Sequence, residues 1–264
     1  MQGTNMTDQK TSTPEFTILH REAHRLLKFN RAERDMNWVG GLITVNLAAS
    51  EMPSAALAFP CVMTHSESGG RLLAITGLEQ GRNLFVDDKG HWTGEYLPAV
   101  LRTWPFRLLD QEDAEGSRPI AVQREALSVT DGDALFDDQG QEMPWLQGVM
   151  KELVALDAAE ATTNAMVNAL HAAGVLTERA LQAVLPNGRQ MELTGFLSVD
   201  EHKLHALEDK VLADLHRQGA LAMAYLHLLS LRKFKMLMDM AASHEPQEPK
   251  AQAAQASKEE SVAA

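Results

Sequence analysis

Histidine pairs at helical spacing are the first side chains in this sequence that could do chemistry. His20 and His24 stand four residues apart, so on a helix both rings would face the same side and could hold a metal ion. The glutamate between them, Glu22, does not directly follow the first histidine, as the zinc-protease motif requires. No third ligand stands out, so surface or structural histidines are the favoured interpretation.

A second pair, His202 and His205, stands three residues apart beside Glu201, Glu208 and Asp209. Carboxylates orient neighbouring histidines and raise their basicity, which makes this group a candidate metal site or proton relay. The same stretch forms the polar side of a leucine-striped helix, and a solvated helix face explains it more simply. A metal-dependent enzyme that uses His202 and His205 is kept as an alternative hypothesis.

Nucleophile motifs are weak in this chain. Ser230 and Lys233 have the Ser-x-x-Lys spacing of penicillin-recognising enzymes, but the companion Ser-Asp-Asn and Lys-Thr-Gly elements are absent, so the match is interpreted as chance. Cys61, the only cysteine, lies in an apolar run, which predicts a buried, unreactive thiol. No Walker, GxGxxG or GxSxG motif is present. We predict no catalytic residue and no cofactor.

The segment 83–106 concentrates the aromatic side chains, with five of the 14 in the chain. One interpretation, which we favour, is a packed corner between a hairpin and a helix. The other is a recognition surface on which Trp and Tyr stack against a sugar, a peptide or a partner. The candidate ligand- or partner-binding residues are Phe85, Trp92, Tyr96, Arg102 and Trp104.

Strand and turn patterns dominate the first half of the chain. The predicted strands are 38–47, 60–65, 71–76 and 119–124. Residues 83–92 are expected to form a hairpin around an Asp-Asp-Lys-Gly turn in which Gly90 takes a positive φ, and a similar Asp-Asp-Gln-Gly turn follows at 137–140. Pro98 suits the first turn of a helix that ends at Trp104.

Helical periodicity dominates the second half. The predicted helices are 144–156, 162–173, 178–185, one that Asp200 caps and Gly219 ends, and 220–240. One returning strand or hairpin is expected at 191–199. Strands first and helices later favour an α+β fold, in which an antiparallel, β-rich N-terminal half packs with a helical C-terminal half.

Composition and charge narrow the class of protein further. The chain has 264 residues, of which 45% are hydrophobic and 23% charged, as in ordinary globular proteins. A net charge of −12 repels phosphate backbones, so we expect no nucleic-acid partner. Residues 1–15 lack the apolar core of a signal peptide, and the longest apolar stretch, 220–231, is too short to span a bilayer. We expect a cytoplasmic protein with flexible tails at 1–14 and 243–264 around one domain.

The aromatic segment also carries a family resemblance. The residues that carry it are Gly77-Leu78, Gly81, Asn83-Leu84-Phe85-Val86-Asp87, Gly90, Trp92, Tyr96-Leu97-Pro98-Ala99, Leu101-Arg102 and Pro105-Phe106. In order and spacing they resemble the central block of the SapC family, a bacterial family named after a gene beside a surface-layer protein export system. Weaker similarity runs from Phe16 to Ala242. Trp104 stands where the family pattern has Tyr, and Phe196-Leu197-Ser198 replaces a Tyr-Arg-like stretch.

The resemblance implies a link to the handling of bacterial surface-layer or envelope proteins, and it implies no catalytic residue. The main hypothesis is therefore a non-enzymatic accessory or binding protein with one domain at 15–242. A protein partner would bind through the aromatic segment or through the Met/Leu-rich final helix, Met223 to Met240. A small-molecule binder for a sugar or peptide, with Trp92, Tyr96 and Trp104 lining a pocket, is the further alternative.

Overall fold

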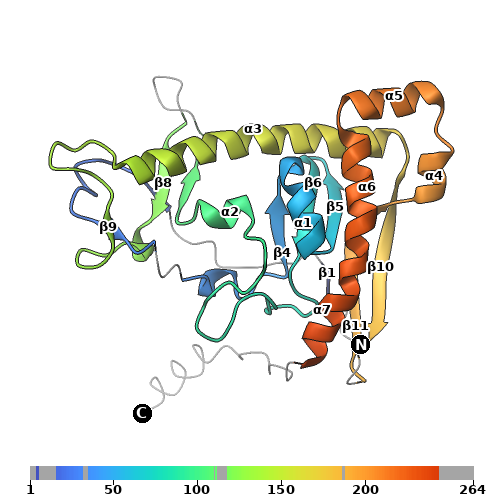
Figure 1. The fold of residues 1–264 in the computed structure, drawn as a ribbon, viewed down its shortest axis with the longest axis horizontal. Helices are drawn as coiled ribbons and strands as arrows, with labels where there is room; N and C mark the ends of the chain where they lie inside the picture. Colours follow the sequence, from blue (N-terminus) through green and yellow to red (C-terminus); the bar gives the residue numbers. More distant parts are fainter. Residues whose placement is uncertain are drawn as a thin grey trace, which may run out of the picture.

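Antiparallel sheets combined with several helices form the framework of the protein, which confirms the predicted α+β class. The computed structural model describes residues 4–5, 16–31, 35–109, 111, 118–185 and 188–243. These residues form one six-stranded, one three-stranded and one two-stranded sheet. Figure 1 shows the small sheets towards one end of the molecule and the large sheet towards the other, with helix α3 (Pro144–Ala172) running across both.

The large sheet has the strand order β1-β11-β5-β6-β4, and β10 also pairs with β11. Every pairing is antiparallel except that of β1 with β11. Its strands are β1 (Thr4–Asn5), β4 (Thr44–Leu47), β5 (Cys61–Ser66), β6 (Gly69–Ile75), β10 (Leu176–Val184) and β11 (Gln190–Val199). The apolar side chains of β5 and β6 are buried in the main core, so this hairpin forms the centre of the sheet.

Two glycines let α3 pass close over the β5–β6 hairpin. Gly69 has a φ of 107°, a conformation that L side chains rarely adopt, and a β-carbon there would collide with Asn164 of α3. A β-carbon on Gly70 would collide with Val167 in the same way. The helix can therefore lie against the sheet only because both positions lack a side chain.

The two small sheets lie beside the N-terminal half of α3. Strands β2 (Phe16–Ile18), β8 (Ile120–Gln123) and β7 (Phe106–Leu108) form the three-stranded sheet in that order. Strands β3 (Lys28–Phe29) and β9 (Asp133–Ala134) form the two-stranded sheet. Since β7 begins at Phe106, the aromatic segment leads directly into the three-stranded sheet.

The shorter helices complete the packing of the large sheet. Helices α1 (Met52–Ala58) and α6 (Ala220–Ser230) pack against each other, and Figure 1 shows both on the same face of the large sheet. The remaining helical elements are η2 (Asn37–Val39), η3 (Ala49–Glu51), α2 (Ala99–Arg102), η4 (Arg124–Ala126), α4 (Glu201–His205), α5 (Asp209–Arg217), η5 (Leu231–Lys233) and α7 (Phe234–Ser243). In the part of the chain that the structure describes, no helix combines the length and apolar character needed to cross a membrane.

Helix α3 joins two apolar clusters. Its 29 residues give it a length of about 43 Å at 1.5 Å per residue. Near its N-terminus, Leu146 and Leu153 pack in one cluster with Phe106 of β7. Near its C-terminus, Val167 and Leu170 pack in the main core. The helix therefore fixes the position of the small sheets relative to the large one.

The prediction of a helix at 178–185 is wrong, because residues 178–184 belong to β10. Leu, Ala, Glu, Arg and Gln in this stretch have high helix propensity. The strand instead pairs with β11 along most of its length, with one irregularity between Arg179 and Leu181. Pairing with a long neighbouring strand outweighs a propensity difference of a few tenths of a kcal/mol per residue.

The other helices predicted from the sequence are present, but the structure joins or divides them at different residues. The helices predicted at 144–156 and 162–173 are one helix, because the Ala- and Glu-rich residues between them continue it. Asp200 caps α4 as predicted, with its side chain accepting hydrogen bonds from the backbone N–H groups of His202 and Lys203. That helix ends after five residues, and α5 follows separately. The predicted final helix is interrupted by η5.

The strand predictions at 60–65, 71–76, 119–124 and 191–199 are confirmed with shifts of one or two residues. The strand predicted at 38–47 is partly wrong, since it begins with η2 and only its end forms β4. Within the predicted N-terminal tail, Thr4–Asn5 forms β1. The rest of 1–14 and the residues after 243 lie outside the described part of the chain.

A buried polar cluster attaches α6 to the large sheet. The His227 side chain is 0% exposed, and its Nδ1 lies 2.7 Å from the carbonyl oxygen of Cys61. Its Nε2 accepts the backbone N–H of Val199 at 3.1 Å, which assigns the ring proton to Nδ1. The hydroxyl of Ser230 accepts the backbone N–H of Cys61 at 3.0 Å. One turn of α6 thus holds both β5 and β11.

Burial holds the pKa values of this cluster far from their ordinary ranges. It raises the pKa of the Cys61 thiol to about 12, which fits the predicted unreactive cysteine. It lowers the pKa of His227 to about 4, and the hydrogen bond to Cys61 opposes this only in part. Both groups are therefore neutral at pH 7, as their surroundings require.

We expect His227 to make the protein less stable in mild acid. The folded pKa of about 4 lies below the ordinary 6.5, so the unfolded chain binds the extra proton first. The stabilisation is complete above pH 6.5 and is lost as the pH falls towards 4, by about 3 kcal/mol in all. Urea unfolding between pH 7 and 4.5 should show this slope, and His227→Asn should flatten it. An equal slope in both proteins would contradict the assignment. Replacing the exposed His216 with Asn is the control.

Candidate functional site

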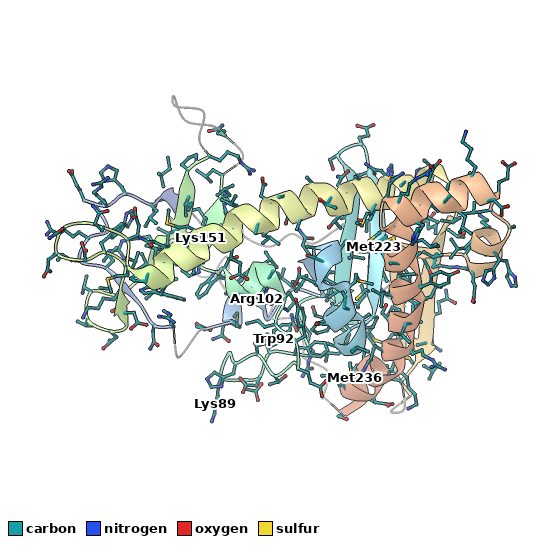
Figure 2. The ribbon with its side chains drawn as sticks, turned by 45° about the horizontal axis from the view of Figure 1, so that its top comes forward. Lys89, Trp92, Arg102, Lys151, Met223 and Met236 are labelled. Carbon is teal, nitrogen blue, oxygen red and sulfur yellow. The ribbon has the colours of Figure 1, made fainter. Side chains whose placement is uncertain are left out.

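A cleft of about 740 Å³ opens beside the N-terminal half of α3. Three stretches line it: the residues around β3 and η2, the end of the aromatic segment, and the first turns of α3. Figure 2 shows Trp92 and Arg102 below α3, with Lys89 at the outer end of the preceding turn. The lining residues are Phe29, Arg31, Met36, His91, Trp92, Leu97, Arg102, Trp104, Phe106, Trp145, Gly148, Val149 and Glu152.

An aspartate-centred turn positions Trp92. Oδ1 of Asp87 accepts the backbone N–H groups of His91 at 2.8 Å and Lys89 at 2.9 Å, and these bonds lower the pKa of its carboxyl. Gly90 closes the turn with a φ of 78°. The two ends of the turn then meet in a β-bridge between Val86 and Trp92. The local sequence therefore fixes the direction from which the Trp92 ring enters the cleft.

A second turn of the same construction precedes α3. Oδ1 of Asp137 accepts the N–H groups of Gln139 and Gln141, both at 2.8 Å. Gly140 has a φ of 77°, and Phe136 bridges to Glu142. Each turn leads to a helix introduced by proline, α2 after Pro98 and α3 at Pro144. Two similar turns therefore set the two helices that carry Arg102 and Glu152.

The three tryptophans of the cleft present ring surface rather than hydrogen-bond donors. The indole N–H of Trp92 donates to the carbonyl oxygen of Tyr96 at 2.9 Å. The Trp104 N–H donates to the Gln123 side chain at 3.0 Å, and the Trp145 N–H donates to Ala134 O at 2.9 Å. All three rings are therefore oriented by the protein itself. They offer apolar and π surface to a ligand.

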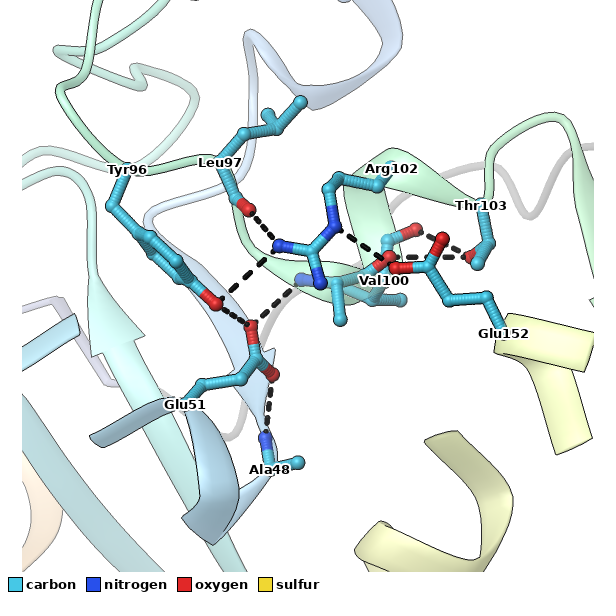
Figure 3. A network of polar contacts seen from close by, with 9 residues as sticks. Ala48, Glu51, Tyr96, Leu97, Val100, Arg102, Thr103 and Glu152 are labelled. Atoms are coloured by element: carbon cyan, nitrogen blue, oxygen red, sulfur yellow. Dashed lines mark hydrogen bonds and ion pairs between the residues drawn. The ribbon is translucent and has the colours of Figure 1, made fainter. Parts of the chain in front are cut away.

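A buried carboxylate holds the segment before α2 in place (Figure 3). Glu51 is only 7% exposed, and its Oε2 accepts the backbone N–H of Ala48 at 2.8 Å. Its Oε1 accepts the Ala99 N–H at 2.7 Å and the Tyr96 hydroxyl at 2.8 Å. Burying a carboxylate is costly unless donors surround it, and here three donors do. The start of α2 is consequently tied to η3, the short helix that ends at Glu51.

Arg102 extends this network to the cleft. One guanidinium NH2 group donates to Leu97 O at 2.8 Å and lies 3.4 Å from the Tyr96 hydroxyl. Its Nε donates to Glu152 of α3 at 2.9 Å. The guanidinium also lies 5.9 Å from the centre of the Tyr96 ring. Arg102 thus joins the wall formed by the aromatic segment to the wall formed by α3, and these bonds hold its guanidinium in one orientation.

The protonation states in this network follow from the same contacts. Burial raises the pKa of the Tyr96 phenol, the hydrogen bond from Arg102 lowers it, and the bond to Glu51 raises it again. Burial alone would lower the pKa of Arg102, but its bonds to Tyr96 and Glu152 outweigh that effect and raise it. At neutral pH the phenol is a donor and the guanidinium is charged.

The structure divides the five predicted aromatic-segment candidates. It brings Trp92, Arg102 and Trp104 together in the cleft. Phe85 is buried in the main core and stacks on Trp92 with ring centres 5.6 Å apart. Tyr96 supports Arg102 rather than lining the cleft. The segment therefore contributes to both the core and the cleft, which were predicted from the sequence as alternatives.

The structure places the other sequence candidates on the surface or in the core. His202 and His205 are exposed on α4, and among the described residues no group of three or more His, Cys, Asp or Glu side chains is arranged to hold a metal ion. Met223 is buried in the main core. The later methionines of the final helices, Met236, Met238 and Met240, are partly buried and pack against this core. Figure 2 shows Met223 and Met236 on these helices, away from the cleft residues Trp92 and Arg102.

The part of the cleft that α3 supplies was not predicted from the sequence. Trp145, Gly148, Val149 and Glu152 follow one another at intervals of three, one and three residues, so they lie on one side of the helix. An aromatic residue, a glycine and a carboxylate on one helix face are the sequence signal that could have indicated the wall of a binding cleft. Arg31 gave no sequence signal, because only the fold brings it over the Trp145 ring, 5.3 Å from its centre.

Comparison with known proteins identifies one relationship. A family model described as SapC matches residues 19–237, a range that includes every residue lining the cleft. No curated protein and no solved structure matches the chain significantly.

We expect Glu51→Gln to destabilise the protein by about 2–3 kcal/mol, since charge-assisted hydrogen bonds are lost and an amide NH2 must face a backbone N–H. Urea unfolding followed by tryptophan fluorescence measures the change. Glu95→Gln is the matched control, because Glu95 is exposed in the same segment. A loss below about 0.5 kcal/mol for Glu51→Gln would contradict the role given to this carboxylate.

Proposed function

Because the chain belongs to the SapC family, we propose that it is a non-enzymatic accessory protein that binds a ligand or a segment of a partner protein in the tryptophan-lined cleft. The partner would be connected with the handling of bacterial surface-layer or envelope proteins, and binding would take place in the cytoplasm. The connection with the envelope rests on the family alone. The binding function rests on the cleft.

One observation carries the proposal: three tryptophans from separate parts of the fold converge on one cleft together with Arg102. At about 740 Å³, the cleft falls within the range of small-ligand sites, roughly 300–1,000 Å³. Mostly apolar walls with a few fixed polar groups are typical of such sites. The hydrogen bonds that orient the indole rings and Arg102 already exist without a ligand, which reduces the entropic cost of binding.

The chemistry of the lining favours binding over covalent catalysis. The described residues that line the cleft include no serine, threonine, cysteine or lysine that could act as a nucleophile. His91 lies on the cleft, but its Nδ1 faces Asp87 at 3.3 Å in an exposed turn. The described walls therefore hold no hydroxyl, thiol or amine nucleophile beside a base.

Gly148 provides a direct test of the cleft. It lies on α3 within the lining, and a β-carbon added there meets no atom within 4 Å. A side chain can therefore be introduced at this lining position without a clash at its β-carbon. We expect Gly148→Phe to reduce binding at least tenfold, as measured by tryptophan fluorescence and calorimetry against a panel of saccharides and of peptides with free and with amidated C-termini.

Gly148→Ala is the matched control, because it adds one methyl group to the same helix position. It should leave binding unchanged and stabilise the protein by about 0.5–1 kcal/mol, since alanine is the better helix former. If ligands from the panel bind the Gly148→Phe protein as tightly as the wild type, the cleft is not the binding site. If no compound binds the wild type, the proposed function fails for these ligand classes.

A further inference from the structure

We propose that the cleft selects ligands that carry a carboxylate beside an apolar group, and that Glu152 occupies the carboxylate position until such a ligand arrives. The inference rests on the proposed function and names the chemistry of its ligand. The source of the carboxylate is either the C-terminus of a peptide or a free organic acid.

The polar groups of the cleft are few and mainly cationic. Of the charged side chains among the described lining residues, Arg31 and Arg102 are positive and only Glu152 is negative. The chain as a whole has a net charge of −12, so a cationic lining is not a consequence of its composition. The indole N–H groups are already bonded within the protein. Among the described lining residues, donors to a polar ligand group therefore come from the two arginines, which carry the positive charge, and from His91, whose Nδ1 faces Asp87.

Arg102 is held so that it can exchange one carboxylate for another. Its bonds to Leu97 O and Tyr96 fix the plane of the guanidinium independently of Glu152. Glu152 receives its bond through a single oxygen, and the two side chains are 38% and 35% exposed. A half-exposed ion pair of this kind contributes little net stability. An incoming carboxylate can therefore replace Glu152, while the guanidinium stays in place to donate to it.

Arg31 supplies a second positive charge with the same character. Its guanidinium lies 5.3 Å from the centre of the Trp145 ring and pairs with Asp133 at 3.5 Å, with both side chains about half exposed. The apolar part of a ligand would meet the tryptophan rings, while its carboxylate would meet arginine. A neutral ligand has no charge with which to displace Glu152, which already accepts a hydrogen bond from Arg102. It therefore gains no ion pair in the cleft.

Calorimetric titration with matched acids and neutral analogues tests the selection. The probes are N-acetyl-alanyl-alanyl-leucine with a free and with an amidated C-terminus, and octanoate against octanol. We expect at least one acid to bind ten or more times tighter than its neutral partner. Preference for the peptide acid would identify a C-terminus as the source, and preference for octanoate would identify a free acid.

Three variants test the roles of the side chains. Glu152→Gln should tighten acid binding about threefold or more, because the competing carboxylate is removed. Arg102→Lys should reduce the ratio of acid to neutral affinity about tenfold, a readout that general destabilisation would not change. Glu160→Gln changes the same charge on an exposed position of α3 outside the cleft lining and should leave the ratio within about twofold.

The outcomes separate this inference from the proposed function. Equal binding of acids and neutral analogues would overturn the carboxylate selection, while Gly148→Phe could still show that the cleft binds ligands. Weaker or unchanged acid binding in Glu152→Gln would overturn the role given to Glu152. Absence of binding by either acid would overturn the inference. If Gly148→Phe reduced the binding of none of the saccharides or peptides of the panel, both the inference and the proposed function would be contradicted.

Discussion

The buried Glu51 carboxylate is the interaction on which the architecture of the cleft depends. A carboxylate that is 7% exposed must be surrounded by donors, and it takes them from Ala48 just before η3, from Tyr96 and from the first residue of α2. These groups are far apart in the sequence, so satisfying one buried group brings two chain segments together. The position of α2 then determines where Arg102 stands.

Helix α3 supplies the second constraint. It packs over the large sheet at one end, where glycines permit a close approach, and against the small sheets at the other. At the second of these ends, the same helical turns carry Gly148 and Glu152 to the cleft. The ion pair of Arg102 with Glu152 therefore joins the two parts of the fold that Glu51 and α3 position separately. A weak contact at this junction leaves room for a ligand to compete.

The aromatic segment stands out in the sequence by its composition, and in the structure its residues belong to both the core and the cleft. Phe85 packs in the core, and the adjoining Trp92 ring stacks on it while another part of that ring lines the cleft. The turn at Asp87 could be predicted because its hydrogen bonds are all local. The opposite wall could not, because Arg31 and α3 reach the cleft only through long-range packing. Likewise β10 has the residues of a helix and becomes a strand only because β11 is beside it.

The sequence by itself determined the α+β class, the acidic charge, the central strands, the turns before α2 and α3, and the family relationship, since these depend on local patterns and on residue order. Only the tertiary structure decided which aromatic rings are core and which line a cleft, that α3 is one helix joining two clusters, and that Glu51 and His227 are buried among donors and acceptors. The physical reason is that burial and long-range hydrogen bonding depend on which segments meet, and sequence spacing alone does not contain that information.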